Sequence, residues 1–290
     1  MTNDTTKSLR LTAEQLRFYK DNDYVLIKNA VPTEVIQLAR KILERWVDDT
    51  ISEWVAKGLL QSSHYKTPFE KRLNVAWQEA GKPSYRRSPR RDLVSPYMYE
   101  FLKHPSLLNT AGSLLESDEV SVHGIFNARP KLPDQNWTNT PWHQDAQYYK
   151  DAEKKHVVSM WMPLQRVTEY NSCLQVAPGF YRNSLRENHL DEDSGFIGLS
   201  KEDAATLTPL SIEMDEGDVL CFNHMLPHRA ASNQSDTVRW SMDIRYEKTA
   251  DATESGKAQG FVARSVTDPA LETSYPEWLE KWAGIDKGSY

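Results

Sequence analysis

The spacing of apolar residues changes near residue 118 and divides the chain into a helical part and a β-rich part. In the first part apolar residues recur every three or four positions, which predicts amphipathic helices. These helices are expected over 11–20, from Pro32 onward and over 96–115. Thr12 and Gln15 have the spacing of a capping box at the first helix, and residues 24–27 have the composition of a short strand.

Residues 61–92 are polar and interrupted by proline, so we expect a solvent-exposed loop there. The same segment carries a group of four arginines, which are Arg86, Arg87, Arg90 and Arg91. An alternative is therefore that this loop forms a lip that binds anions.

Beyond residue 118, short runs of β-type composition follow one another, separated by turn-forming residues. The runs cover 119–128, 157–164, 173–177, 209–213, 218–223 and 238–246. Because no helices alternate with these runs, the sheets should be antiparallel, as in a barrel or jelly roll. We expect one domain over 1–290, with a helical part at 1–115, the β core at about 119–250 and a C-terminal loop and helix at 251–290.

Composition narrows the class of protein. The 290 residues are 39% hydrophobic and 26% charged, which is enough for a buried core, and the net charge of −6 argues against nucleic acid as a partner. Two cysteines, Cys173 and Cys221, are too few for a disulfide framework, which favours the cytoplasm. No window reaches the ~18 consecutive apolar residues of a membrane span, and the first residues have no apolar signal segment. We therefore expect a soluble cytoplasmic protein without a membrane partner.

His143 and Asp145 stand two residues apart where a β run begins, in the segment Pro141-Trp142-His143-Gln144-Asp145. Residues two apart on a strand point to the same face, so both side chains can bind one ion. His228 is our candidate for a third ligand, and His224 is the alternative. Two histidines and one carboxylate with open positions are the ligands of non-heme Fe(II) oxygenases. Without a third ligand, such a pair is more often a hydrogen-bonded His and Asp than a metal site.

The run from Val238 to Tyr246 alternates between polar and apolar residues. Its polar positions are Arg239, Ser241, Asp243 and Arg245. Four polar side chains facing into a barrel are costly unless they bind a polar partner. Arg239 and Ser241 suit the distal carboxylate of 2-oxoglutarate, because the guanidinium offers a fork of donors and the hydroxyl adds another. The alternative is a polar face that lies in water, as in many antiparallel sheets.

Together these motifs resemble the phytanoyl-CoA dioxygenase-like branch of the Fe(II)/2-oxoglutarate-dependent oxygenases. The resemblance rests on His143 and Asp145, on Gly217-Asp218, on His228, and on Arg239 eleven positions later. It also covers 11–36 and the stretch from Val158 to Pro178-Gly179. It implies a mainly β fold with flanking helices around a double-stranded β-helix, which is a cupin-like jelly roll.

The resemblance also assigns roles to residues. It implies that His143, Asp145 and His228 hold Fe(II), which favours His228 over His224, and that Arg239 grips the far carboxylate of 2-oxoglutarate. Trp161 and Asn127 match positions that contact this cosubstrate in the family, although Trp161 is nearly as well explained as a core aromatic.

The substrate-binding residues are less well indicated. Strand alternation allows His123 to reach the pocket, with an exposed or structural histidine as an equal alternative. Tyr148 follows the metal-binding segment closely. Arg245 and Arg264 suggest a polar or anionic substrate, with solvated charges as the alternative.

The expected enzyme is a dioxygenase that uses Fe(II), 2-oxoglutarate and O2. It would hydroxylate a C–H bond of a small polar metabolite, of the natural-product or amino-acid type, and release succinate and CO2. Desaturation, ring closure or demethylation would use the same site. A non-redox cupin-like isomerase or binding protein is the alternative from another class, but it would have no use for Arg239 and Ser241.

Overall fold

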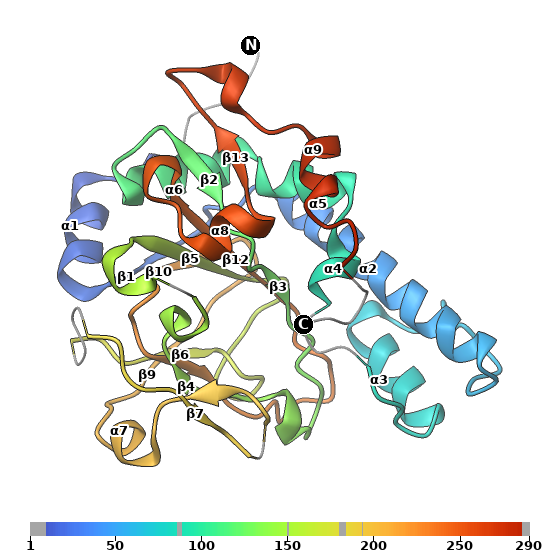
Figure 1. Ribbon diagram of the computed structural model, residues 1–290. Coiled ribbons are helices and arrows are strands. Elements are labelled where there is room, and N and C mark those ends of the chain that lie inside the picture. Colours follow the sequence, from blue (N-terminus) through green and yellow to red (C-terminus); the bar gives the residue numbers. More distant parts are fainter. Residues whose placement is uncertain (1–9, 86–88, 150, 180–183, 193, 286–290) are drawn as a thin grey trace, which may run out of the picture.

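The computed structural model describes residues 10–85, 89–149, 151–179, 184–192 and 194–285 (Figure 1). Its helices in the described residues are α1 (Ala13–Asn22), α2 (Thr33–Ala56), α3 (Phe69–Glu79), α4 (Arg90–Leu93), α5 (Pro96–Leu102), α6 (Pro105–Leu115), α7 (Lys201–Ala205), α8 (Glu254–Gln259) and α9 (Tyr275–Glu280). The capping box predicted at the first helix is present, since Thr12 and Gln15 bond reciprocally.

Two antiparallel sheets form the core. The larger has the order β1 (Tyr24–Ile27), β10 (Val219–Asn223), β5 (Val157–Pro163), β12 (Ser241–Lys248), β2 (Val120–Val122) and β13 (Phe261–Arg264), with β3 (Asn127–Ala128) paired to β12. The smaller has the order β4 (Thr140–His143), β11 (His228–Ala230), β6 (Leu174–Val176) and β9 (Leu210–Ile212). A separate hairpin joins β7 (His189–Leu190) and β8 (Ile197–Gly198). The expected fold class, a mainly β jelly roll with flanking helices, is confirmed.

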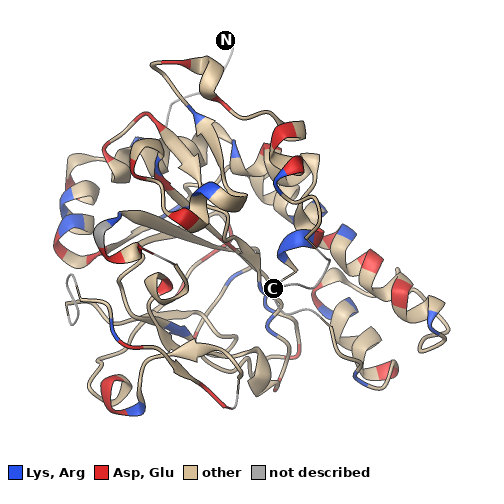
Figure 2. Cartoon of the chain, in the orientation of Figure 1, with Lys and Arg blue, Asp and Glu red and all other residues tan. Residues whose placement is uncertain are grey.

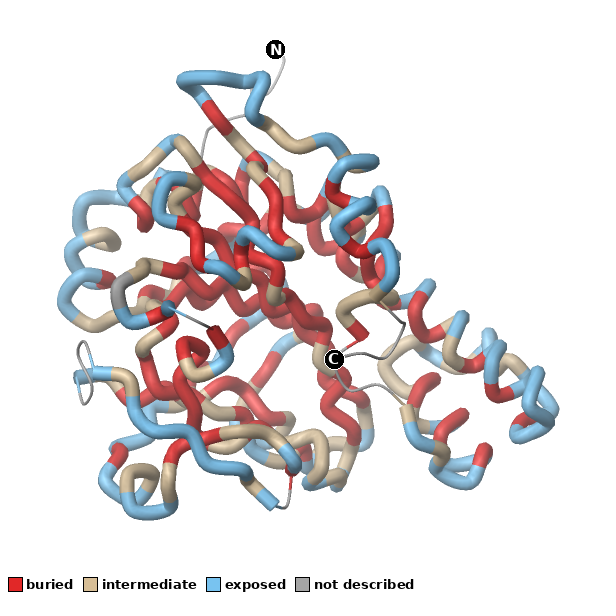
Figure 3. Tube along the Cα trace, in the orientation of Figure 1, coloured by how far each residue is buried: buried red, intermediate tan, exposed pale blue. Residues whose placement is uncertain are grey.

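Helices cover the outer face of the larger sheet. Helix α6 packs on β2, β5 and β12, and α2 packs on α3, α4 and α5. Trp240, which precedes β12, is fully buried between the rings of Trp46 and Phe69. Figure 3 shows the central strands buried while the outer turns of the helices are exposed. Apolar burial between helices and sheet therefore supplies the main core.

Three sequence predictions need correction. Residues 61–92 are not one loop, because α3 and α4 lie within them; Leu73, Ala76 and Trp77 of α3 are buried at helical spacing. The helical run 96–115 is divided into α5 and α6, since Pro105 begins a new helix. The C-terminal part contributes strand β13 as well as a helix. Of the four arginines in the predicted loop, Arg86 and Arg87 lie outside the described residues.

Charged residues of both signs are interspersed over the helices and loops seen in Figure 2. Among the described residues, no helix combines the length and the apolar character needed to cross a membrane.

Candidate active site

The two predicted metal-binding histidines lie on neighbouring strands of the smaller sheet. His143 ends β4 and stands directly opposite His228 of β11, with ring centroids 4.1 Å apart. The Nδ1 of His143 lies 2.8 Å from the carbonyl oxygen of Pro141, and the Nδ1 of His228 lies 3.0 Å from that of Leu226. A carbonyl oxygen can only accept, so each Nδ1 carries the proton and each Nε2 keeps a free lone pair.

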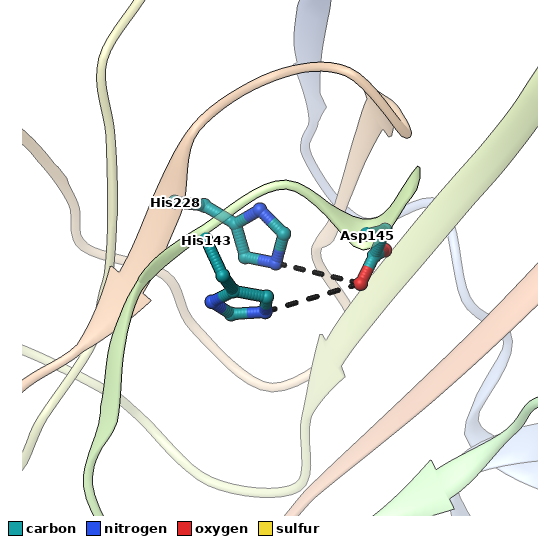
Figure 4. A group of neighbouring side chains, drawn as sticks. All are labelled: His143, Asp145 and His228. Carbon is teal, nitrogen blue, oxygen red and sulfur yellow. Dashed lines mark ion pairs between the residues drawn. The ribbon is translucent and has the colours of Figure 1, made fainter. Parts of the chain in front are cut away.

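Asp145 meets these histidines from a turn. The chain leaves β4 after His143, and Asp145 begins a short 3₁₀ helix, Asp145–Tyr148, so the strand geometry expected for this residue is replaced by a turn. Its Oδ1 lies 3.9 Å from the Nε2 of His143 and 3.8 Å from that of His228 (Figure 4). The three side chains are buried, and their ligand atoms lie within 4.8 Å of one another.

This donor set fits a divalent iron ion. Two neutral imidazoles and one carboxylate on one side leave further positions open. Burial and the neighbouring His228 lower the pKa of His143 to about 3, so its imidazole stays neutral at pH 7. A neutral imidazole is the form that binds a metal.

Arg245 and Ser159 hold the carboxylate of Asp145 in place. Arg245 donates from Nε to Oδ2 at 3.0 Å and from Nη2 to Oδ1 at 2.7 Å, while the Ser159 hydroxyl donates to Oδ2 at 2.5 Å. Burial by itself would raise the pKa of Asp145, but the charge of Arg245 outweighs it and lowers that pKa well below its usual range. The sequence suggested Arg245 as a substrate contact, whereas the structure places its guanidinium on Asp145.

A small cavity lies beside the two histidines and receives side chains from both sheets. Its lining consists of Arg129, Thr140, His143, Trp161, Leu174, Phe222, His228, Ala230, Arg239 and Asp243. The structure thus brings Trp161 and Arg239 together with the histidines, as predicted from the sequence.

Arg239 is fixed at this cavity by neutral acceptors. Its Nη1 donates to the Ser241 hydroxyl at 2.6 Å and its Nε to the Ser172 carbonyl at 3.1 Å, and the guanidinium lies 5.2 Å from the ring centroid of Trp161. Burial lowers the pKa of Arg239 to about 9, so the guanidinium is still charged at pH 7. Since a guanidinium has five N–H donors, several remain for an anion.

Asn127 and Tyr148 lie near the cavity without lining it. Asn127 is buried on β3 opposite Asp243 and accepts a hydrogen bond from Arg90 at 3.5 Å. Tyr148 presents its ring edge to His143 at a centroid distance of 6.0 Å, and its hydroxyl donates to the Ile197 carbonyl.

His123 and Arg264 do not line the cavity, although the backbone amide of His123 donates to the carbonyl oxygen of Arg245. His123 is fully buried against Tyr149, and burial lowers its pKa to about 3. Arg264 lies on β13 at the edge of the larger sheet and binds Asn109 and Asp118, so it is separate from the metal cluster.

His224, the alternative third ligand, has both nitrogens occupied. The Val157 amide donates to its Nδ1 at 3.3 Å, and its Nε2 donates to the Ala152 carbonyl at 3.1 Å. It therefore has no free lone pair to offer a metal, which agrees with the choice of His228.

Sequence reasoning missed two residues of this site. Arg129 lines the cavity, with its Nε 3.5 Å from Asp243 Oδ2. Its position two residues after Asn127 was the available signal. Ser159 lies opposite Arg245 in the sheet, and nothing in the sequence distinguishes it from any other small residue of a buried strand.

A jelly-roll core that carries a buried His-Asp-His cluster beside a buried arginine defines a 2-oxoglutarate-dependent non-heme iron oxygenase. Residues 19–241 match the sequence model of the family described as Phytanoyl-CoA dioxygenase (PhyH). The chain belongs to this family, whose members use Fe(II), 2-oxoglutarate and O2. The resemblance inferred from the motifs is confirmed.

Individual relatives are distant in sequence. A probable phytanoyl-CoA dioxygenase of Caenorhabditis elegans is 25% identical over 248 residues, covering 81% of this chain and 75% of the relative. A 2-aminoethylphosphonate dioxygenase of the uncultured bacterium HF130_AEPn_1 is 30% identical over 110 residues, covering 38% and 40%. The crystal structure of EctD from S. alaskensis with 2-oxoglutarate and 5-hydroxyectoine superposes with a TM-score of 0.58 at 18% identity, over 88% of this chain and 80% of that chain. This last likeness shows the fold alone.

Proposed function

We propose that this protein hydroxylates a small polar metabolite, with iron held by His143, Asp145 and His228 and with 2-oxoglutarate anchored by Arg239 and Ser241. The observation that carries the proposal is the shared cavity, which the two histidines and Arg239 line together. When bound, iron and 2-oxoglutarate supply the oxidising chemistry, in which O2, 2-oxoglutarate and a C–H bond give succinate, CO2 and an alcohol.

The side chains of the protein orient these groups. The carbonyls of Pro141 and Leu226 fix the imidazole rings, so that both Nε2 atoms face the same point. Arg245 prevents Asp145 from turning away, because it binds both carboxylate oxygens. Such bonds to the ligands tune metal affinity in proteins generally.

At the other end of the cavity, the free donors of Arg239 and the hydroxyl of Ser241 provide a carboxylate site. Trp161 closes one wall and buries the guanidinium. Asn127, buried on β3 opposite Asp243, remains our candidate for a further contact to the cosubstrate.

The charge of Arg129 supports a substrate with an anionic group. Arg129 reaches the cavity, and its carboxylate partner among the described residues is Asp243 at 3.5 Å, so donors remain for a ligand. Tyr148, half-exposed beside His143, extends the rim. The relative named for 2-aminoethylphosphonate and the structure containing 5-hydroxyectoine both involve small polar molecules. The same site could also catalyse desaturation, ring closure or demethylation of such a molecule.

The test is succinate release in a screen of small zwitterions, carboxylates and phosphonates with Fe(II) and 2-oxoglutarate. His143→Ala and Asp145→Ala should abolish release with every substrate, and Arg239→Ala should raise the KM for 2-oxoglutarate. Succinate release that survives in both His143→Ala and Asp145→Ala would move the metal site elsewhere. If the protein binds the metal but does not bind 2-oxoglutarate, it is instead a non-redox binding protein.

A further inference from the structure

Lys131 and Arg239 form a directly opposed pair between the segments that follow β3 and precede β12. Their backbones exchange two hydrogen bonds, from Lys131 N to Arg239 O at 2.9 Å and from Arg239 N to Lys131 O at 3.0 Å. Directly opposed residues of an antiparallel pair project their side chains to the same face. The two side chains therefore lie next to each other, and they are 2% and 1% exposed.

This pair consists of two basic side chains without an acidic partner among the described residues. Lys131 Nζ donates to the Ala230 carbonyl at 3.0 Å and to Asn139 Oδ1 at 3.3 Å, and Arg239 is likewise bonded to neutral oxygens only. Among the described residues, neither cation has a carboxylate within ion-pair distance. Like charges opposite each other are unfavourable in a sheet, and buried unpaired charges are costly.

The nearby carboxylate of the cavity does not offset this excess. Asp243 Oδ2 lies 3.2 Å from Arg245 Nη2 and 3.5 Å from Arg129 Nε, so it already faces two other guanidinium groups. The positive charge at the Arg239 end of the cavity is therefore uncompensated by the protein.

The amino group of Lys131 is bonded to a residue of the cavity lining, although Lys131 itself does not line the cavity. Its acceptor, the carbonyl of Ala230, belongs to a residue that lines the cavity beside Arg239. An ammonium has three N–H donors, of which two are used. Burial and the charges of Arg239 and Arg129 lower the pKa of Lys131, so an anion entering the cavity would favour its protonated form.

We propose that Lys131 is a second cation of the subsite for the far carboxylate of 2-oxoglutarate, so that Lys131 and Arg239 together select a dicarboxylate. This inference rests on the proposed function, which places 2-oxoglutarate at Arg239. Lys131 acts as a specificity-determining residue: its charge favours ligands that carry the distal carboxylate over oxo acids that lack it.

The test compares 2-oxoglutarate with 2-oxobutyrate, which has the same oxo-acid end but no distal carboxylate. Binding of each to the Fe(II)-loaded protein is measured without O2 by thermal shift and titration, in the wild type, Lys131→Met and Arg239→Met. In Lys131→Met we expect the Kd of 2-oxoglutarate to rise about 10- to 100-fold, while the Kd of 2-oxobutyrate changes less than about twofold.

Equal changes in the two Kd values, or an unchanged preference for 2-oxoglutarate, would overturn the role of Lys131. A purely structural lysine would lower the ligand-free Tm and leave the preference intact. Lys131→Gln retains a donor for Ala230 and provides the same comparison if the methionine variant does not fold. If the wild type shows no preference for 2-oxoglutarate over 2-oxobutyrate, the proposed function is overturned as well. If the preference is lost in Arg239→Met but kept in Lys131→Met, only the role of Lys131 is overturned.

Discussion

At Asp145 a single carboxylate is held by protein donors on one side and faces two imidazoles on the other. Arg245 and Ser159 occupy Oδ2, and Arg245 also reaches Oδ1, the atom nearest to both histidines. The side chain is 2% exposed, so water does not share these contacts. The position of the third metal ligand therefore depends on one arginine.

Removing that arginine should affect both stability and metal affinity. Arg245→Met leaves Asp145 as a buried charge without its cation, which costs about 3–5 kcal/mol. The affinity for Fe(II) should fall about 10- to 100-fold, because the ligand loses its support. Urea unfolding and anaerobic Fe(II) titration measure the two effects.

Arg264→Met is the matched control, because Arg264 lies on β13 with Asn109 and Asp118. It should leave the Fe(II) affinity unchanged. Equal losses of affinity in the two variants would contradict a specific role for Arg245.

Buried histidines should make the metal-free protein sensitive to acid. The pKa is lowered from an ordinary value of 6.5 to about 3 in His123 and His143 and to about 4 in His156, in each case first by burial. At a pH between the ordinary and the lowered pKa, these histidines are protonated in the unfolded chain but not in the native protein. The free energy of unfolding therefore decreases as the pH falls below 6.5. The loss is about 1.4 kcal/mol per pH unit for each histidine. Urea unfolding between pH 4 and 7 measures it, and His123→Leu should flatten the slope by about one proton.

The residue scale also shows where sequence reasoning stops. Alternation correctly predicted that Arg239 and Arg245 are buried, with Arg245 on β12 and Arg239 in the segment that precedes it. It could not tell that one side chain reaches the cavity and the other reaches Asp145, because partners across the barrel depend on three-dimensional packing. Arg264 was selected for its charge alone, and charge does not indicate which edge of a sheet a residue occupies.

At the scale of elements, α8 follows β12 in the chain and lies in close contact with β12 and β2. Glu247 of β12 accepts the Thr253 amide at 2.9 Å and lies against Gly256, where a Cβ atom would overlap its carboxylate. A Cβ atom at Gly260 would overlap the carbonyl oxygens of Val122 and Gly256. Two glycines therefore set how closely the helix approaches the sheet.

Gly260→Ala should destabilise the protein by about 1–3 kcal/mol or more, because both obstructing atoms belong to the backbone. The loss is measured as a decrease in the urea midpoint. Ala258→Ser, at an exposed position of the same helix, should stay within about 0.5 kcal/mol of the wild type. A neutral Gly260→Ala would mean that α8 can move away from β2 without cost.

Glu247 should make its own contribution to pH dependence, of opposite sign to that of the histidines. Burial raises its pKa from 4.5 to about 7, so the native protein holds a proton that the unfolded chain releases, and this stabilisation is lost as the pH rises from 4.5 through 7. Glu247→Gln should remove the loss, and its stability relative to the wild type should increase by up to about 3 kcal/mol between pH 5 and pH 8. A constant difference between the two proteins across this range would contradict the shift.

Most elements could be predicted from the sequence because their apolar spacing is regular. Helix α3 was missed because Leu73, Ala76 and Trp77 stand among polar residues, and they are buried only when α2 lies alongside. The irregular chain between β2 and β3 likewise follows from pairing with β12, which local composition does not contain.

At the scale of the whole molecule, ligands should stabilise the fold by mass action. Fe(II) and 2-oxoglutarate at 100 times their Kd should add about 2.7 kcal/mol each, or about 4–5 °C in Tm for a chain of this length. Anaerobic thermal unfolding should show both shifts in the wild type. His143→Ala should lose the Fe(II) shift, while His189→Ala, exposed on the hairpin of β7, should keep it. Equal shifts in the two variants would place the metal elsewhere.

The metal ligands are held by strands of both sheets. Both histidines belong to the smaller sheet, whereas Ser159 and Arg245, which hold Asp145, belong to β5 and β12 of the larger one. A metal ion bound by all three ligands therefore connects the two sheets, which are otherwise joined by side-chain packing and by loops. The affinity for iron then reports how completely the layers have docked, and any substitution that separates them will weaken metal binding even if it lies far from the ligands.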